Sequence, residues 1–283
     1  MTVFKSKREL QQFSLNAKRA GKTIGLVPTM GYLHAGHTSL IDIARARADI
    51  VIVSIFVNPT QFAPTEDLDR YPRDFAHDLE LCREHRADVI FAPEPGEMYD
   101  ADASTWVNET MLSRPLCGAS RPTFFRGVTT VVSKLFLLAQ PDLAVFGLKD
   151  AQQLFVVRRM VRDLDFPIEI VAAPLVRDVD GLALSSRNRY LSEDERTRAL
   201  SIHRTLLKCK AAILAEGLAA APRILEAGKA DITAAGGKVD YLEVLDSADL
   251  EAPDDKTREV LLAAAAFFGT TRLIDNEVIE FKK

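Results

Sequence analysis

The sequence predicts an α/β fold in two parts. Short apolar runs of strand length recur through the first half of the chain and alternate with segments of helical periodicity. This alternation is typical of βαβ units and predicts a parallel sheet of Rossmann type with right-handed crossovers. After about residue 176 the pattern changes to long helices rich in Ala, Leu, Lys and Arg, followed by two apolar runs joined by a polar loop. We therefore expect a Rossmann-type domain over residues 1–176 and a smaller α+β domain over 177–283.

The individual elements follow from apolar runs, helical periodicity and turn residues. The predicted parallel strands are residues 24–27, 50–57, 88–91, 143–146 and 168–172, with Pro28 ending the first of them. The predicted helices of this part are residues 7–20, a segment that begins near residue 37, 73–86, 125–139 and 151–163. The second part is predicted to hold helices at 193–215 and 222–235 and strands at 241–245 and 260–267.

Composition excludes several classes of protein. The chain of 283 residues carries a net charge of −4 and no long basic run, which argues against binding to nucleic acid. Its three cysteines are scattered, which excludes a CxxC-type zinc site and suits a reducing cytoplasm. The N-terminus has no apolar signal segment, and the most apolar stretch, 260–268, is too short to span a bilayer. We expect a soluble, cytoplasmic protein without membrane contact.

The most informative stretch is residues 23–40, TIGLVPTMGYLHAGHTSL. A buried strand, a glycine turn and a helix N-terminus follow one another, and free backbone N–H groups at such a point favour an anion. His34 and His37 lie three residues apart on one side of the first helical turn. Gly36 lacks a Cβ atom, so that a nucleobase can approach closely. In this context His-Ala-Gly-His resembles the HIGH signature of the nucleotidyltransferase superfamily, whose members bind ATP or another nucleotide.

Polar residues also follow the later predicted strands, where ligands collect in open α/β sheets. Asn58 and Gln61 follow the second strand, although Asn58-Pro59 is also an ordinary turn signal. Gly147, Lys149 and Asp150 form a similar strand-to-helix turn after the fourth strand. Ser185-Ser186-Arg187 offers two hydroxyls and a guanidinium suited to a polyphosphate, but it also fits a simple helix N-cap.

Six segments together give a more specific match than any one of them. PTMGYLHAGH, FVNPTQF, RPTFFRGV, FGLKDAQQL, DGLALSSRN and TRLIDN resemble the pantothenate synthetase family, in matching order across nearly the whole chain. The resemblance implies an ATP-dependent ligase that condenses (R)-pantoate with β-alanine through a pantoyl adenylate and releases AMP and diphosphate. It also implies Mg²⁺ carried with ATP, no metal held by the protein alone, and a homodimer.

The resemblance implies a role for each matching residue. His34, His37, Lys149 and Arg187 would form the catalytic group, with both histidines on the ATP phosphates and His37 as proton donor. The implied ATP site is Met30, Gly31, His34, Gly36, His37, Gly147, Lys149, Asp150, Val176, Ser185, Ser186 and Arg187. The implied site for pantoate and β-alanine is Asn58, Gln61, Arg121 and Gln153.

The chain departs from the family pattern at three places. The family usually has Glu at Leu148, an aromatic residue at Ala151 and Gly-His at Thr123-Phe124. These departures motivate one alternative, an ATP-binding homologue that has lost catalysis. The other alternative is a simple nucleotidyltransferase of the same superfamily, although such an enzyme has no need for Gln61 or for the Gln152-Gln153 pair.

Overall fold

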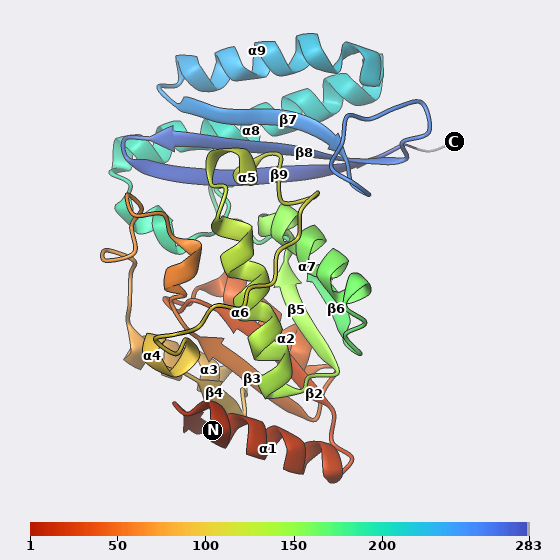
Figure 1. Cartoon of the computed structure of the whole chain (residues 1–283). Helices are drawn as coiled ribbons and strands as arrows, with labels where there is room; N and C mark the ends of the chain where they lie inside the picture. Colours follow the sequence, from red (N-terminus) through yellow and green to blue (C-terminus); the bar gives the residue numbers. More distant parts are fainter. Residues whose placement is uncertain (282–283) are drawn as a thin grey trace.

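The computed structural model describes residues 1–281 and contains two sheets. Six parallel strands form the larger sheet in the order β1-β4-β3-β2-β5-β6, and three antiparallel strands form the smaller sheet in the order β7-β8-β9. In Figure 1 the smaller sheet, with helices α8 and α9, lies above the upper end of the larger one. The predicted α/β fold class is confirmed.

The first part of the chain alternates strands and helices. Its elements are β1 (Thr2–Phe4), α1 (Lys7–Arg19), β2 (Ile24–Thr29), α2 (Ala35–Arg45), β3 (Ile50–Ile55), η1 (Pro59–Gln61), α3 (Phe75–Glu84), β4 (Val89–Phe91), α4 (Pro95–Met98), α5 (Cys117–Ser120), α6 (Phe124–Ala139), β5 (Leu143–Gly147), η2 (Leu148–Asp150), α7 (Ala151–Asp163) and β6 (Glu169–Ala173).

The remaining elements build the smaller sheet and its helices. They are η3 (Ser186–Tyr190), α8 (Glu193–Glu216), η4 (Leu218–Ala220), α9 (Ala221–Ala234), β7 (Lys238–Asp246), β8 (Glu259–Phe268) and β9 (Thr271–Glu280). A capping box of Ser192 and Glu195 begins α8.

One prediction about the elements is wrong, and two strands were not predicted. Pro28 does not end β2 but lies inside it, opposite Ser54 of β3. Strand β5 pairs with β2 only at Gly25 and Leu26, so at Pro28 no β5 partner needs the N–H group that proline lacks. The sequence reasoning also missed β1, a three-residue edge strand, and β9, which holds the TRLIDN segment.

The larger sheet is buried on both faces, as a parallel sheet requires. Ile52 of β3 packs in a cluster with residues of α1, α6 and α7, whereas Val53 packs in a second cluster with residues of α2 and α3. Alternate residues of each strand therefore face opposite layers, which explains the continuous apolar runs in the sequence.

The smaller sheet uses its two faces differently. Leu262 and Ala264 of β8 pack with the helices α8 and α9. Leu261 and Ala263 point the other way and pack with Phe125 of α6 and Ala151 of α7. The smaller sheet thus packs against α6 and α7 of the first part of the chain, and it leaves a cavity beyond the carboxyl ends of the parallel strands. No helix within residues 1–281 combines the length and apolarity needed to cross a bilayer.

Candidate active site

One large cavity of about 720 Å³ brings the predicted site residues together. Its lining comes from the strand ends of the parallel sheet, from residues 174–176 and 182–188 and from the smaller sheet. Every predicted site residue except Gly31 lines it: Met30, His34, Gly36, His37, Asn58, Gln61, Arg121, Gly147, Lys149, Asp150, Gln153, Val176, Ser185, Ser186 and Arg187. Segments far apart in the sequence therefore meet in one place.

Gly31 shapes the turn behind the cavity. Its φ is +84°, and a Cβ atom there would come within 2.9 Å of Asp78 Oδ2. The Asp78 carboxylate accepts hydrogen bonds from the backbone N–H groups of Tyr32 at 2.9 Å and Leu33 at 2.6 Å. Burial raises the pKa of Asp78, and these two hydrogen bonds oppose the rise. Sequence reasoning missed Asp78, because a single acidic residue in an amphipathic helix gives no signal of its own.

The two histidines lie at the N-terminus of α2. His34 is the N-cap, and its Nδ1 accepts a hydrogen bond from the Gly36 N–H at 3.2 Å. An accepting Nδ1 assigns the proton of the neutral ring to Nε2. A Cβ atom on Gly36 would lie 2.9 Å from His34 Cε1, so this glycine leaves room for the His34 ring. The ring centroids of His34 and His37 are 4.0 Å apart.

Both imidazoles are neutral at pH 7. Burial, followed by the charge of Lys149, lowers the pKa of His34 to about 4, against a smaller opposing effect of Asp150. Burial also holds the pKa of His37 well below 6.5, and His34 and Lys149 lower it further. The buried Nδ1 of His37 has no hydrogen-bond partner among residues 1–281. The pair is thus able to form neutral hydrogen bonds to a ligand, while Lys149 supplies the positive charge.

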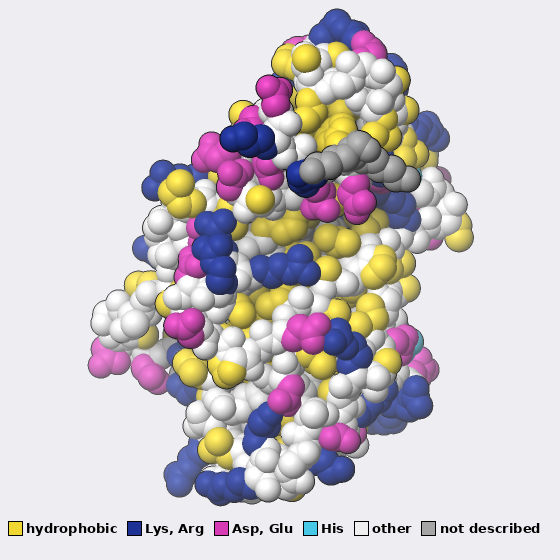
Figure 2. All heavy atoms as spheres, turned by 90° about the vertical axis from the view of Figure 1, so that its right-hand side faces the viewer, with side chains coloured by type: hydrophobic (Ala, Val, Ile, Leu, Met, Phe, Trp, Pro, Cys, Tyr) yellow, Lys and Arg dark blue, Asp and Glu magenta, His cyan; other side chains and the backbone are white. Residues whose placement is uncertain are grey.

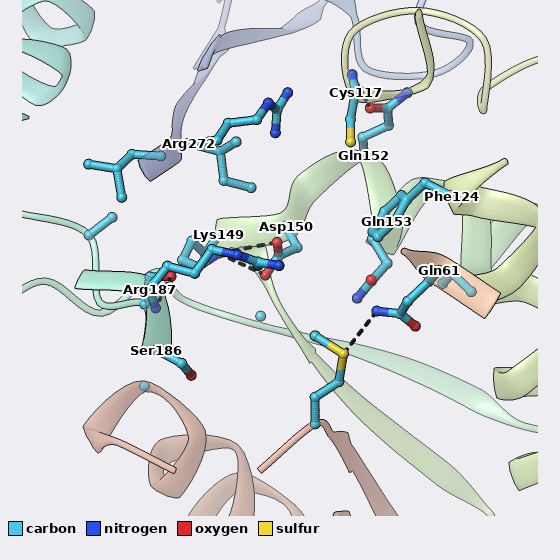
Figure 3. Close-up of a pocket in the computed structure, with 18 of the residues that line it drawn as sticks. Gln61, Cys117, Phe124, Lys149, Asp150, Gln152, Gln153, Ser186, Arg187 and Arg272 are labelled. Atoms are coloured by element: carbon cyan, nitrogen blue, oxygen red, sulfur yellow. Dashed lines mark hydrogen bonds and ion pairs between the residues drawn. The ribbon is translucent and has the colours of Figure 1, made fainter. Parts of the chain in front are cut away.

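Lys149 lies in the short turn η2, between β5 and α7. Its Nζ is 3.1 Å from both carboxylate oxygens of Asp150. Figure 3 shows both side chains directed into the cavity.

Three places in the chain depart from the family pattern described above. Of these, Ala151 is buried against the smaller sheet, and Leu148 packs on the apolar cluster of α6 and α7. Phe124 lines the cavity under the guanidinium of Arg121, which lies 3.9 Å from the ring centroid.

The side-chain amide of Gln61 is oriented by a hydrogen bond from the side-chain amide of Asn58. Gln61 Nε2 points toward the sulfur of Met30 at 3.1 Å. Its Oε1 accepts from Asn58 Nδ2 at 3.0 Å, and Asn58 is itself held by the Tyr99 hydroxyl at 2.9 Å. In the view of Figure 3 the carboxamides of Gln61 and Gln153 lie next to each other, across the cavity from Lys149 and Arg187. Asn58 therefore orients Gln61 in the structure.

Gln152 differs from its neighbour Gln153. Its carboxamide accepts from the Cys117 N–H at 3.1 Å and donates to the carbonyls of Leu112 at 2.9 Å and Pro115 at 2.7 Å. All of these partners lie in the loop around α5. Gln152 thus fixes one wall of the cavity.

Three arginines of the cavity wall are paired with carboxylates. Arg187 forms a two-fold contact with Asp67, with Nε and Nη2 each 2.9 Å from an oxygen. Arg121 pairs with Glu66 through Nε at 2.6 Å, and Arg272 pairs with Asp240 through Nη2 at 2.7 Å. Glu66 and Asp67 are adjacent in one loop, so this loop is held both to Arg121 and to Arg187.

The electrostatics of the Asp67–Arg187 pair follow from burial and contact. Burial alone would raise the pKa of Asp67, but the hydrogen bonds and positive charge of Arg187 outweigh it and lower this pKa. The Arg187 guanidinium also lies over the rings of Tyr71 and Phe62, at 5.2 and 5.9 Å from their centroids. Sequence reasoning missed Glu66 and Asp67, because an acidic loop is also typical of ordinary solvated surface.

Nearly the whole chain matches one protein family. Residues 2–278 match the family model described as pantoate-beta-alanine ligase. The chain belongs to the pantoate-beta-alanine ligase family. Among curated relatives, the pantothenate synthetase of Clostridium novyi (strain NT) is 52% identical over 273 residues, covering 96% of both chains. That of Thermotoga neapolitana is 49% identical over 280 residues, covering 99% of this chain and 100% of the relative.

Solved structures of this family share the fold. The pantothenate synthetase of Thermus thermophilus superposes with a TM-score of 0.89 at 44% identity, covering 98% of this chain and 99% of the other. The pantoate-beta-alanine ligase of Francisella tularensis, solved with beta-gamma ATP and beta-alanine, gives 0.82 at 31% identity, covering 98% and 97%. The resemblance predicted from the six sequence segments is therefore confirmed.

Proposed function

We propose that this protein condenses (R)-pantoate with β-alanine at the expense of ATP, giving pantothenate, AMP and diphosphate through a pantoyl adenylate. One observation carries the proposal beyond family membership. Two neutral histidines and Lys149 line the same cavity as the carboxamides of Gln61 and Gln153. The first group suits the phosphates of ATP, and the second suits the hydroxyl and carboxylate oxygens of pantoate.

In the first step, the pantoate carboxylate attacks the α-phosphorus of ATP and diphosphate leaves. Negative charge builds on the phosphate oxygens, so catalysis depends on positioning and charge stabilisation. Lys149 contributes the positive charge, His37 donates a hydrogen bond through its ring N–H, and His34 donates from Nε2. Arg187 leaves Asp67 to meet the leaving diphosphate.

In the second step, the amine of β-alanine attacks the acyl carbonyl and AMP leaves. Gln61 and Gln153 hold the pantoyl part in place for this attack, and Asn58 keeps the Gln61 amide oriented. The carboxylate of β-alanine pairs with Arg121, whose guanidinium already forms an ion pair with Glu66. Holding both reactants in one cavity converts a bimolecular reaction into an effectively unimolecular one.

The remaining residues predicted for the ATP site contact the ribose and the adenine, shape the pocket or close it. Asp150 accepts from the ribose hydroxyls, and Val176 packs on adenine. Met30, Gly36 and Gly147 shape the pocket, Gly31 holds its turn, and Ser185 and Ser186 close over the triphosphate. No group of three His, Cys, Asp or Glu side chains able to hold a metal occurs within residues 1–281. Mg²⁺ would arrive as part of the substrate MgATP, coordinated by phosphate oxygens.

The proposal includes a division of labour between two domains. Residues 1–176 bind nucleotide and pantoate, and residues 177–283 act as a lid over ATP. In support, the Ser185-Ser186-Arg187 segment lies just after the proposed boundary, and the smaller sheet contributes the residues 270–276 to the cavity lining.

The proposed assembly is a cytoplasmic homodimer. Figure 2 shows a face with a broad apolar area crossed by Lys and Arg side chains. Strand β6 is the edge of the larger sheet, with three half-buried residues in a row. An apolar area and an unpaired strand edge are both features of surfaces that associate. Sedimentation equilibrium tests the dimer, because the chain mass of 31.3 kDa would appear doubled.

The test of the reaction is AMP production by the purified protein with MgATP, D-pantoate and β-alanine, each omitted in turn. We expect AMP only when all three are present, with pantothenate confirmed by its mass. A folded protein that binds ATP but forms no AMP in any mixture would instead support the inactive homologue. Diphosphate release with pantoate and ATP alone, in single turnover, would reveal the adenylate step.

A further inference from the structure

The TRLIDN segment has a position that the proposed reaction does not yet use. It lies on β9, where Asn276 pairs with Ala263 of β8 and therefore lies on the face of the smaller sheet that packs against the first part of the chain. The Asn276 side chain is 8% exposed. Its Nδ2 donates to the carbonyl of Leu148 at 2.9 Å and to the carbonyl of Lys149 at 3.0 Å. Both protons of one amide group are thus used on two consecutive carbonyls.

These two carbonyls belong to the two peptide planes that flank the Cα atom of Lys149. The Leu148 carbonyl lies in the peptide before this atom, and the Lys149 carbonyl lies in the peptide after it. Because peptide groups are planar, holding both carbonyls restricts φ and ψ of Lys149. The two dihedral angles decide where the Cβ atom points, so Asn276 fixes the direction in which the lysine side chain leaves the backbone.

Among residues 1–281, Asn276 is the side chain that hydrogen-bonds to the backbone of this turn. Residues 148–150 form a single 3₁₀ turn without a side-chain cap, and such short turns have poor hydrogen-bond geometry. On the opposite face of β9, Asp275 forms an ion pair at 2.6 Å with Arg177, which directly follows Val176 in the chain. Strand β9 therefore contacts η2 and the residue next to Val176, which are two of the segments that the proposed reaction gives to ATP.

We propose that Asn276 is a positioning residue for catalysis: with its amide donors used on the turn, it aims the Lys149 ammonium at the histidine pair. The inference rests on the proposed function for its effect on rate, but its effect on Lys149 does not. The smaller sheet then contributes to the ground-state geometry of the ATP site in addition to any closure over it.

The variants Asn276→Ala and Asn276→Leu remove both donors, and the second keeps a similar side-chain volume. We expect each to lower kcat/KM for ATP by about ten- to a hundredfold, because Lys149 loses both contacts that fix its direction and a small misplacement of such a group is costly. In a Lys149→Ala background the same changes are expected to cost less than about threefold, because interacting residues are not additive. Equal losses in both backgrounds would overturn the proposal.

A second readout needs no turnover. In the ligand-free protein, NMR titration of the histidine rings reports the nearby lysine charge, because Lys149 lowers the pKa of both His34 and His37. We expect Asn276→Leu to move the His34 midpoint upward from about 4, in the same direction as Lys149→Ala. An unchanged midpoint contradicts the proposal even if the wild-type protein proves inactive.

Lys210→Ala is the matched control. Lys210 on α8 also holds β9, through Glu277 at 2.7 Å and the Val278 carbonyl at 3.1 Å, but these two contacts lie away from η2. We expect it to lower thermal stability without moving the histidine titration. If Asn276→Leu fails to fold, Asn276→Ser removes the amide without adding an apolar side chain, and its shorter hydroxyl does not reach the two carbonyls; we expect a shift in the same direction, and no shift in that variant would count against the proposal.

Discussion

Two regions of the cavity wall treat charge in opposite ways. At the N-terminus of α2, His34 and His37 are neutral, and His37 Nδ1 has no partner among the described residues. At the loop of Glu66 and Asp67, these two carboxylates already hold Arg121 and Arg187. The histidine region is ready for a ligand as it stands. The arginine region must exchange a carboxylate of the protein for the anion of a ligand, so its net contribution to binding is smaller than its charge implies.

The largest expected effect tests the histidine region. His37→Ala removes a buried donor that nothing else in the cavity replaces. We expect kcat to fall by about two to four orders of magnitude, the range for a proton-transfer or charge-stabilising group. AMP formation measures it, with His77→Ala on the exposed surface of α3 as control. An unchanged rate would remove His37 from the mechanism.

The next largest effect concerns the binding of pantoate. Gln61→Leu keeps the volume of the side chain but removes the amide that Asn58 orients. Pantoate oxygens would then be left without a partner, and we expect KM for pantoate to rise about ten- to a hundredfold while KM for ATP changes little. Initial rates with each substrate varied in turn measure both constants. A rise in the KM for ATP alone would contradict the assignment of Gln61 to pantoate.

A smaller effect, of opposite sign, tests the arginine region. Asp67→Asn weakens the contact that Arg187 must leave before it meets a phosphate. We expect ATP to bind a few-fold more tightly, because a neutral amide holds the guanidinium less strongly than the carboxylate does. Calorimetric titration with a non-hydrolysable ATP analogue measures the affinity. Glu66→Gln is the matched control, since it frees Arg121 and should leave ATP affinity unchanged; equal or weaker binding in Asp67→Asn would show that the ion pair supports the site.

The smallest effect concerns stability against pH. The folded-state pKa of His34 is about 4, below the 6.5 of an unfolded histidine, so between these values the unfolded chain binds more protons. The free energy of unfolding is therefore expected to fall as pH drops from about 6.5 toward 4, and His37 adds to the fall. Urea midpoints at pH 7 and pH 5 measure it, and His34→Ala should reduce the difference. A difference that stays the same in this variant would assign the pH dependence to other groups.

The local sequence determined the parallel strands and the turns that follow them. Apolar runs such as 50–57 are visible because a buried parallel strand needs unbroken hydrophobicity, and the glycines and histidines of residues 31–37 mark a turn by their chemistry. Since the carboxyl ends of parallel strands share one edge, these turns had to meet. This geometry explains why His34, Gln61 and Lys149 could be predicted to lie near one another.

Only the tertiary structure decided which partner each polar side chain has. Asp67 meets Arg187 across 120 positions of sequence, and Asn276 meets Leu148 across 128. No periodic pattern in the sequence predicts such a pair, because a single hydrogen bond constrains one residue at each end and places no constraint on the type of the neighbouring residues. The same holds for Pro28, which remains in β2 because the neighbouring strand β5 no longer pairs there. The sequence alone thus specified the chemistry of the cavity, and long-range packing decided which of its charges are free to act.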